Sequence, residues 1–278
     1  TLLHLGPGLA NGLANLHNAR RADTPLVNIV GDHATYHAQY DAPLASDLKG
    51  FASPVSGWYH SSPSPKTAAA DGARAVQAAM SAPGQIATLV LPADTAWLEA
   101  EGPSPALDIV GPAAVEGAAV DRIAALLKNE KKTAILIRGA ALKEDGLLAA
   151  GRIAAKTGAR IMCDTFTARI QRGAGRVMVD RLPYFSEQIE EDLAGTEQLI
   201  LVGAKPPVSF FAYPGKASWM TPEGCEINVL SHPHEDGTGA LEALAEAIGA
   251  PAEPINVAKL ELPALPTGKL DSFTAGQV

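Results

Sequence analysis

The chain has 278 residues, of which 47% are hydrophobic and 19% are charged. This composition is typical of a globular protein, and the length leaves room for two domains with substantial cores. Acidic residues outnumber basic ones by 30 to 22, and the net charge is −8. The sequence contains no long basic run, which argues against nucleic acid or an anionic membrane as a partner. No apolar run approaches the ~20 residues that span a bilayer.

The first thirty residues predict a βαβ unit. A short apolar run meets a turn at Gly6-Pro7-Gly8, and the apolar residues that follow recur at helical spacing at Leu9, Leu13 and Leu16. Residues 26–30 are mostly β-branched or apolar and predict a second strand. The turn of such a unit lies at the carboxyl edge of the sheet, where ligands of open α/β sheets bind. The sequence therefore places a candidate site within its first dozen residues.

One interpretation of this turn is dinucleotide binding by a Rossmann-type oxidoreductase that uses NAD(P). Gly6, Gly8 and Gly12 form a glycine-rich pattern, and Asp32 follows the second predicted strand, where a ribose-binding acid would lie. Pro7 argues against this interpretation, because proline has no N–H group to donate to a pyrophosphate.

A second interpretation depends on a resemblance. The segment from His4 to Asn18 is similar to thiamine diphosphate (ThDP) enzymes of the acetolactate synthase and benzoylformate decarboxylase group. The synthases have a similar Gly-Pro-Gly turn, a nearby Asn that Asn11 matches, and a helix leading into a Pro-Leu-Val strand, as at 25–27. The decarboxylases carry a His before the turn, as His4 does here. Residues 81–94, which end in Pro-Ala-Asp, resemble the exit from the family's pyrimidine-binding domain.

The resemblance implies ThDP-dependent chemistry on a 2-keto acid. The reaction would be acetolactate synthase-like carboligation or decarboxylation, through an enamine intermediate. His4 would be the catalytic proton relay, since imidazole titrates in the range that this role needs. The residues implied to bind the cofactor are Gly6, Pro7, Gly8 and Asn11, of which Gly8 and Asn11 would approach the aminopyrimidine. The alternative for His4 is a buried, hydrogen-bonded histidine at the end of a strand.

The rest of the first domain is predicted as a loop, a strand, a helix and a last strand. The loop 31–50 holds His33 and His37, whose spacing would suit a metal site on a helix. Only two ligands would be accounted for, so a polar loop is the simpler explanation and no metal residues are assigned. Residues 54–58 resemble a short strand of the family. Ser64 and Pro65 predict a helix start, the apolar stripe of that helix is predicted at Ala69, Ala73, Val76 and Met80, and a buried strand follows at 87–91.

Residues 99–117 hold three prolines and predict a linker, and a second set of alternating helices and strands follows it. This alternation predicts a parallel sheet with helices on both faces, and it resembles the Rossmann-like central domain of the ThDP family. The expected fold is therefore α/β with two such domains, at 1–98 and 118–250, and 251–278 is a connector. The second set has strands at 133–137, 160–163, 198–202 and 226–230, and helices at 120–127, 147–156, 186–194 and 241–248.

Three further features of the second domain are candidates for a flavin site, a metal site or a reactive thiol. Residues 203–211 lack the Gly-Ala-Arg-Phe run of the flavin-binding relatives and hold two prolines, which argues against FAD. Residues 232–236 contain His and acidic side chains, but a polar turn before a helix is the simpler explanation. Cys163 and Cys225 are the only cysteines; we expect reduced thiols, with Cys163 a small core residue, and a cytoplasmic protein.

The family's ThDP site needs pieces that this sequence lacks. A glutamate upstream of the His4 segment and a Gly-Asp-Gly motif followed by Asn, which holds Mg²⁺ and the diphosphate, are both absent. We therefore expect a fragment of a longer enzyme that uses ThDP and magnesium and assembles as a homodimer or homotetramer. The other possibility is a non-catalytic α/β binding or assembly module.

Overall fold

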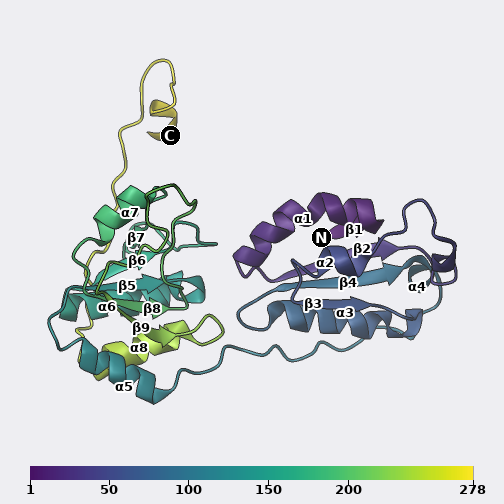
Figure 1. Ribbon diagram of the computed structural model, residues 1–278, viewed down its shortest axis with the longest axis horizontal. Helices are drawn as coiled ribbons and strands as arrows, with labels where there is room; N and C mark the ends of the chain where they lie inside the picture. The colour runs from purple at the N-terminus through teal and green to yellow at the C-terminus, as the bar shows by residue number, and fades with distance from the viewer. Residues whose placement is uncertain (278) are drawn as a thin grey trace.

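The computed structural model describes residues 1–277, and it consists of two α/β units joined by an extended segment (Figure 1). The N-terminal unit, residues 2–97, is built on a four-stranded sheet, and the C-terminal unit, residues 117–250, on a five-stranded sheet. Every pair of neighbouring strands in both sheets runs parallel. The predicted fold class, two separate parallel sheets with helices on both faces, is confirmed.

The N-terminal unit alternates strands and helices from its first residues. Its elements are β1 (Leu2–His4), α1 (Leu5–Arg21), β2 (Leu26–Asp32), η1 (Ala38–Tyr40), α2 (Leu48–Ala52), β3 (Trp58–Ser61), α3 (Pro65–Met80), β4 (Ile86–Pro92) and α4 (Ala93–Trp97). The strand order is β1-β2-β4-β3. His4 lies opposite Gly31, and Asp32 lies opposite Pro92, so the carboxyl ends of three strands meet at one edge.

Helices cover both faces of this sheet (Figure 1). On one face α1 and α2 pack over β2 and β4, where Leu9, Leu16 and Val30 are buried. On the other face α3 packs over β4 through Ala75 and Ala79. Burial of each such apolar side chain contributes roughly 1.5–3 kcal/mol for the larger ones and less for alanine. The α1 stripe that the sequence predicted is therefore the face that anchors this helix.

Two sequence predictions for the N-terminal unit need correction at their boundaries. Gly6-Pro7-Gly8 does not form a turn before a helix, because α1 begins at Leu5 directly after β1. The change of direction is made at Leu5, whose φ is 54°. Proline fits in the first helical turn because its missing N–H would have no intrahelical partner there. The strand expected at 54–58 lies later, since β3 begins at Trp58.

The buried face of α3 also differs from the predicted stripe. Ser64 caps the helix, as predicted, by accepting a hydrogen bond from the Lys66 N–H. Val76 and Met80 are about half exposed, and the buried positions are instead Asp71, Ala75 and Ala79. Alanine-rich helices lack large apolar side chains to fix the inward face, so a carboxylate with hydroxyl partners is accommodated where the periodicity predicted none.

The four strands predicted for the C-terminal unit lie within one residue of their predicted bounds. Its elements are α5 (Gly117–Leu126), β5 (Thr133–Ile137), η2 (Gly139–Leu142), α6 (Glu144–Thr157), β6 (Arg160–Cys163), β7 (Asp180–Arg181), α7 (Ser186–Leu193), β8 (Gln198–Val202), β9 (Glu226–Ser231) and α8 (Gly237–Ala247). The strand order is β7-β6-β5-β8-β9. The sequence did not predict β7, which is two residues long and exposed.

The core of the C-terminal unit lies mainly on one face of its sheet. Helices α5, α6 and α8 cover that face, and residues such as Ile135, Ile153 and Leu241 are fully buried between them and the strands. Helix α7 covers the opposite face, where Ile189 and Leu193 pack against β5, β6 and β8. The near-continuous apolar strands β5 and β8 follow from burial on both faces.

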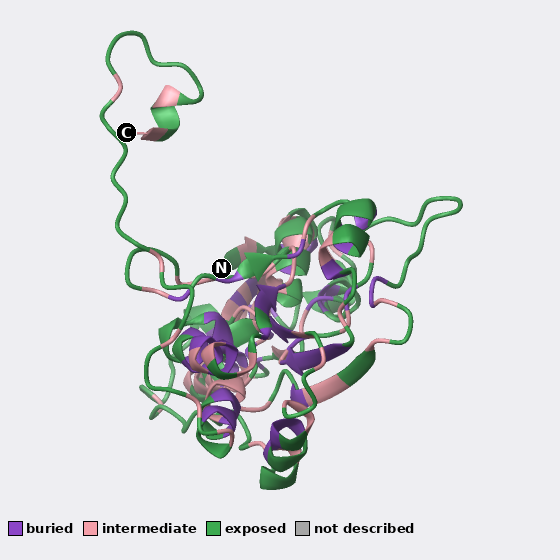
Figure 2. Cartoon of the chain, turned by 90° about the vertical axis from the view of Figure 1, so that its left-hand side faces the viewer, coloured by how far each residue is buried: buried purple, intermediate pink, exposed green. Residues whose placement is uncertain are grey.

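The segment between the units follows the surface of both. The Asp108 carbonyl accepts from Gln77 of α3 at 2.8 Å, and Ala113 pairs with Glu235 next to α8. At the other end, residues 256–258 pair with residues 175–178, and the chain beyond them is mostly exposed (Figure 2). The short helix η3 (Thr274–Gln277) ends the described chain, and Val278 of the expected connector lies outside the described residues. Within residues 1–277, no helix has the length and apolarity that a membrane crossing requires.

Candidate functional site at the carboxyl edge of the first sheet

His4 lies at the carboxyl end of β1 and at the N-cap position of α1. Its side chain is exposed and makes no capping hydrogen bond, and the first turn of α1 contains no acidic residue. The first-turn N–H groups of Leu5 and Gly6 are therefore left without a side-chain cap, with the positive end of the helix dipole beside the imidazole. The alternative in which His4 is a buried, hydrogen-bonded residue is wrong, because the ring is on the surface.

Gly8 and Asn11 lie on the same face of α1 as His4, since positions 4, 8 and 11 are spaced by one helical turn each. Asn11 is exposed. A Cβ placed on Gly8 would lie 3.4 Å from the His4 Cβ, so glycine leaves the surface beside the imidazole without a projecting side chain. The result is an exposed ledge with an imidazole at one end and an amide at the other.

The other two glycines of the pattern are explained by packing. A Cβ on Gly6 would lie 1.9 Å from the Ser46 Oγ, and one on Gly12 would lie 2.9 Å from a methyl group of Leu3. Gly6 therefore lets the loop before α2 rest on the helix start, and Gly12 lets α1 pack against β1. This packing accounts for the spacing that suggested a dinucleotide fingerprint, so the spacing no longer supports that interpretation. Pro7 is exposed beside Gly6.

Two hydrogen bonds join the loop after β2 to the start of α4 at this edge of the sheet. Asp94, two residues after β4, accepts from the backbone N–H of Thr35 at 2.9 Å and also from its hydroxyl. These hydrogen bonds, chiefly the one from the hydroxyl, hold the pKa of Asp94 below its usual value. Asp32 accepts from the His33 N–H at 2.8 Å. The sequence contains the Pro-Ala-Asp exit but carries no sign of its partner Thr35, because nothing local links positions 35 and 94.

The loop after β2 carries the histidines considered as metal ligands. The rings of His33 and His37 are 5.5 Å apart, and the ring of Tyr40 lies 5.8 Å from that of His37. His33 lies in irregular loop and His37 in the turn that follows it, and not on the helix that the metal hypothesis required. Across the described residues 1–277, no three His, Cys, Asp or Glu side chains gather in a way that could hold a metal ion.

Charge and burial act together at the base of this edge. Burial raises the pKa of Tyr59, and the negative charges of Asp32 and Asp47 raise it further. The Tyr59 hydroxyl therefore stays protonated near neutral pH and remains a hydrogen-bond donor.

The remaining sequence candidates lie in the C-terminal unit, away from this edge. Cys163 is fully buried in the core, and burial raises the pKa of its thiol, as expected of a small core residue. Asp236 caps α8 by accepting from the Gly239 N–H, and Glu235 accepts from the His232 N–H, so residues 232–236 form the predicted polar turn.

Comparison with known proteins relates the chain to ThDP enzymes. Residues 1–53 match the family model "Thiamine pyrophosphate enzyme, N-terminal TPP binding domain". A Mycobacterium tuberculosis protein named "Putative acetolactate synthase large subunit IlvX" is 48% identical over 277 residues, which cover 100% of this chain and 53% of that protein. The chain thus spans about half the length of this relative.

Solved structures share the fold at lower identity. The ThDP-dependent 4-hydroxybenzoylformate decarboxylase of Rhodococcus jostii RHA1 superposes with a TM-score of 0.73 at 17% identity, over 98% of this chain and 53% of that one. The benzoylformate decarboxylase of Polynucleobacter necessarius gives 0.72 at 18% identity, over 98% of this chain and 54% of that one. These structures show that both units occur together, in this order, in one polypeptide.

Proposed function

We propose that the chain belongs to the family of ThDP-dependent enzymes related to acetolactate synthase and benzoylformate decarboxylase, and that it is part of an enzyme that acts on 2-keto acids. The reaction is carboligation of the acetolactate synthase kind or simple decarboxylation. The single observation that carries the proposal is the exposed His4 at the carboxyl edge of the sheet, beside an uncapped helix start and the open surface at Gly8.

We assign roles on the ledge by what each group can do. ThDP, when bound, supplies a nucleophilic carbon and an electron sink for the loss of CO₂ from a 2-keto acid. The ledge suits a flat heteroaromatic ring, because Gly8 leaves room for it and Asn11 offers both a donor and an acceptor. Gly6 and Pro7 shape the start of the helix below it. His4 donates and accepts the proton that the reaction moves.

The diphosphate and its metal need a different part of the protein. The printed sequence holds no Gly-Asp-Gly motif, and the described residues offer no metal-binding cluster. We infer that another segment supplies Mg²⁺ and the diphosphate site, and that the enzyme is a homodimer or homotetramer in which this segment faces the His4 ledge. The two free cysteines support a cytoplasmic location.

The domain roles follow from the same relationship. Residues 1–98 act as the C-terminal part of the pyrimidine-binding domain, and 118–250 act as the central domain. Residues 99–117 link them, and 251–278 connect the central domain to the diphosphate-binding domain. The proline-rich run after β8 supports a central domain without FAD, because prolines remove backbone donors there.

The test is a His4→Ala variant of the full-length enzyme, with His17→Ala as its matched control. His17 is exposed and lies on the same helix, about three and a half turns further along. We expect turnover of 2-keto acids to fall by ~10²–10⁴ in the His4 variant, the usual contribution of a positioned acid–base group. The control should retain its turnover. Melting temperature is measured in parallel, and because both histidines are exposed we expect it to change little in either variant.

Unchanged turnover in His4→Ala would contradict the catalytic role. A fall in both variants together with a lower melting temperature would indicate a structural effect on α1 instead. If the purified full-length protein processes no 2-keto acid in the presence of ThDP and Mg²⁺, the proposal of an enzyme fails and the chain is a binding or assembly module.

A further inference from the structure

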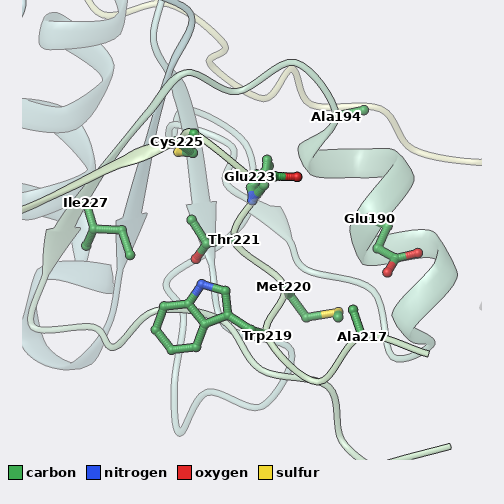
Figure 3. Close-up of a pocket in the computed structure, with 11 residues that line it drawn as sticks. Glu190, Ala194, Ala217, Trp219, Met220, Thr221, Glu223, Cys225 and Ile227 are labelled. Atoms are coloured by element: carbon green, nitrogen blue, oxygen red, sulfur yellow. The ribbon is translucent and has the colours of Figure 1, made fainter. Parts of the chain in front are cut away.

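A cavity lies in the C-terminal unit, and none of the residues that line it belongs to the His4 ledge. It has a volume of about 590 Å³ and opens between α7, the start of β9 and the loop 217–225 (Figure 3). Small-molecule sites in proteins have volumes of roughly 300–1,000 Å³, so the space suits a ligand of that size. The ThDP roles proposed above use none of its residues.

A buried hydroxyl in the wall of this cavity has no partner. Thr221 is 7% exposed, and its Oγ1 finds no hydrogen-bonding partner within the described structure. Figure 3 shows the hydroxyl on the side of Thr221 that faces the Trp219 indole. A buried hydroxyl left unsatisfied destabilises the fold, so a ligand that hydrogen-bonds to it removes that penalty.

The charged groups at the cavity are both carboxylates. Glu190 projects from α7 and Glu223 from the loop, and neither takes part in an ion pair among residues 1–277. Among the described residues that line the cavity, none is Lys, Arg or His. Lys216, which directly precedes the loop 217–225 in the sequence, forms an ion pair with Glu187 at 2.9 Å. That bond is the main reason for the raised pKa of Lys216, and the charge of Glu190 contributes least.

The remaining lining is apolar or neutral. Trp219, Met220 and Ile227 supply most of it, and the Trp219 side chain is about half exposed at the mouth. Burial raises the pKa of Cys225, and the neighbouring Glu226 raises it further, so this thiol stays neutral at physiological pH. An indole beside two carboxylates attracts a cation through its ring face as well as through charge.

We propose that this cavity binds a small organic cation, an ammonium group on an aromatic or branched aliphatic body. The ammonium group lies between Glu190 and Glu223 and donates to the Thr221 hydroxyl. The apolar body packs against Met220 and Ile227, with the Trp219 ring over it. The two carboxylates repel anionic ligands, 2-keto acids included. The cavity is therefore not a second site for the 2-keto acid substrate.

The test uses phenethylammonium as the probe and calorimetry on the 278-residue chain. 2-Phenylethanol and 3-phenylpropionate serve as neutral and anionic probes of similar shape. We expect saturable binding of phenethylammonium, at least tenfold weaker binding of the alcohol and no binding of the acid. Binding should weaken as salt is raised, because the two carboxylates are exposed.

Three variants assign the binding to this cavity. Glu190→Gln with Glu223→Gln should weaken binding at least tenfold, and Thr221→Val should weaken it about threefold or more. Thr221→Ser keeps the hydroxyl and should restore the affinity, which distinguishes loss of the hydroxyl from damage to the fold. Glu242→Gln, an exposed position on α8, is the control and should bind as the unmodified chain does.

Binding of the acid as tight as that of the amine would overturn the proposal. So would an affinity that survives the double glutamine change, or no saturation by phenethylammonium up to roughly 10 mM, a concentration at which binding would be too weak for a built site. This result is independent of the ThDP proposal, because the cavity variants touch no residue of the ledge.

Discussion

The two sheets of this protein differ in what their interiors contain. In the C-terminal unit the large core between the sheet and helices α5, α6 and α8 consists of aliphatic side chains, alanine and one cysteine, and the buried polar residues of that unit, Ser186, Gln198, Thr221 and Ser231, are uncharged. In the N-terminal unit the buried residues include Asn28, Thr88 and Asp71. Asn28 donates to Thr88 at 3.1 Å and accepts from the Thr1 hydroxyl at 2.7 Å.

This difference indicates which unit contributes more stability and which unit carries the proposed function. A close-packed apolar core gains free energy from every methylene that it buries, whereas a buried polar network mainly avoids a penalty and fixes geometry. The proposed chemistry lies in the unit that buries a carboxylate, Asp71, and its exposed histidine and uncapped helix contribute nothing evident to the fold. We therefore expect the C-terminal unit to be the more stable of the two, and the predictions below test this.

The largest effect is expected from Ile153→Ala in the C-terminal core. Ile153 is fully buried on α6, and truncation of such a residue to alanine typically costs ~2–5 kcal/mol. Hydrogen exchange measured on β8 should report this loss, while exchange on β4 stays unchanged because the two sheets have separate cores. Leu148→Ala is the matched control, since Leu148 lies on the same helix and is 44% exposed. Equal losses in both sheets would show that the units unfold as one and would break the comparison.

A smaller loss is expected from Asp71→Asn in the N-terminal unit. The Asp71 carboxylate is fully buried; it accepts from Ser62 at 2.8 Å and from Thr67 at 3.0 Å, and it contacts Arg74 and His60. Because the Arg74 side chain is half exposed, water compensates part of the lost pair, and we expect a cost of about 1–3 kcal/mol. Hydrogen exchange on β4 measures this loss of stability. Asp121→Asn is the control, because Asp121 is exposed on α5.

The same carboxylate gives this unit a defined pH dependence. Burial pushes the pKa of Asp71 upward, but the hydrogen bonds from Ser62 and Thr67 and the charges of His60 and Arg74 outweigh it, so the pKa is lowered. A lowered folded-state pKa means stability that is fully present above the unfolded value of about 3.9 and is lost as pH falls below it. Asp71→Asn should show less acid loss in β4 than the unmodified chain does. An identical acid profile would show that the network does not couple to protonation.

A cost of about 1 kcal/mol is expected from Gly6→Ala. The added Cβ would displace Ser46, which lies in an exposed loop and can yield. Gly8→Ala is the control, because its Cβ would make an ordinary contact of 3.4 Å with the His4 Cβ. Ser46→Gly should restore the melting temperature of the Gly6 variant. Failure of that rescue would mean that Gly6 is needed for something other than packing.

The sequence predicted elements that repeat a simple pattern. β5, β6 and β8 have their predicted bounds because long aliphatic runs are buried on both faces, and Gly158 ends α6 with a φ of 74°, as a helix-terminating glycine does. The stripe of α3 was predicted wrongly because alanine-rich sequence gives a weak periodic signal, and no pattern announces a buried aspartate. Helix α5 begins at Gly117, inside the stretch assigned to the linker.

The candidate site was predictable only in part. His4, Gly8 and Asn11 share a local motif, so the sequence alone suggested them. The Thr35–Asp94 bridge and the Ser46–Gly6 contact join residues that lie 59 and 40 positions apart, and one sequence without homologues carries no signal for such pairs. The sequence did not predict the cavity at Thr221 for the same reason, because α7 and the loop 217–225 come together only in the folded chain.

The smallest effect is expected where the two units touch, at Arg138. Its guanidinium contacts the Arg21 carbonyl and lies 3.5 Å from Asp23 of the N-terminal unit and 3.9 Å from Asp164 at the end of β6. Burial raises the pKa of Asp164, and the charge of Arg138 opposes part of that rise. Arg138→Ala removes the opposition, so the pKa of Asp164 should rise further.

The sign of the expected change follows from that rise. A carboxyl whose folded-state pKa is raised favours the folded state while it is protonated, and that advantage is lost as pH rises from the unfolded value of about 3.9 through the folded one. The stability of the C-terminal unit, read from hydrogen exchange on β5, should therefore fall more steeply above pH 4 in Arg138→Ala than in the unmodified chain. The total loss should stay below about 1 kcal/mol, because the ion pairs are partly exposed. Adding Asp164→Asn should remove the extra slope while leaving the lost contact with Asp23 in place. If the slope persists in the double variant, the contact between the units, and not the titration of Asp164, governs the stability of the C-terminal unit, and the two sheets are less independent than their cores indicate.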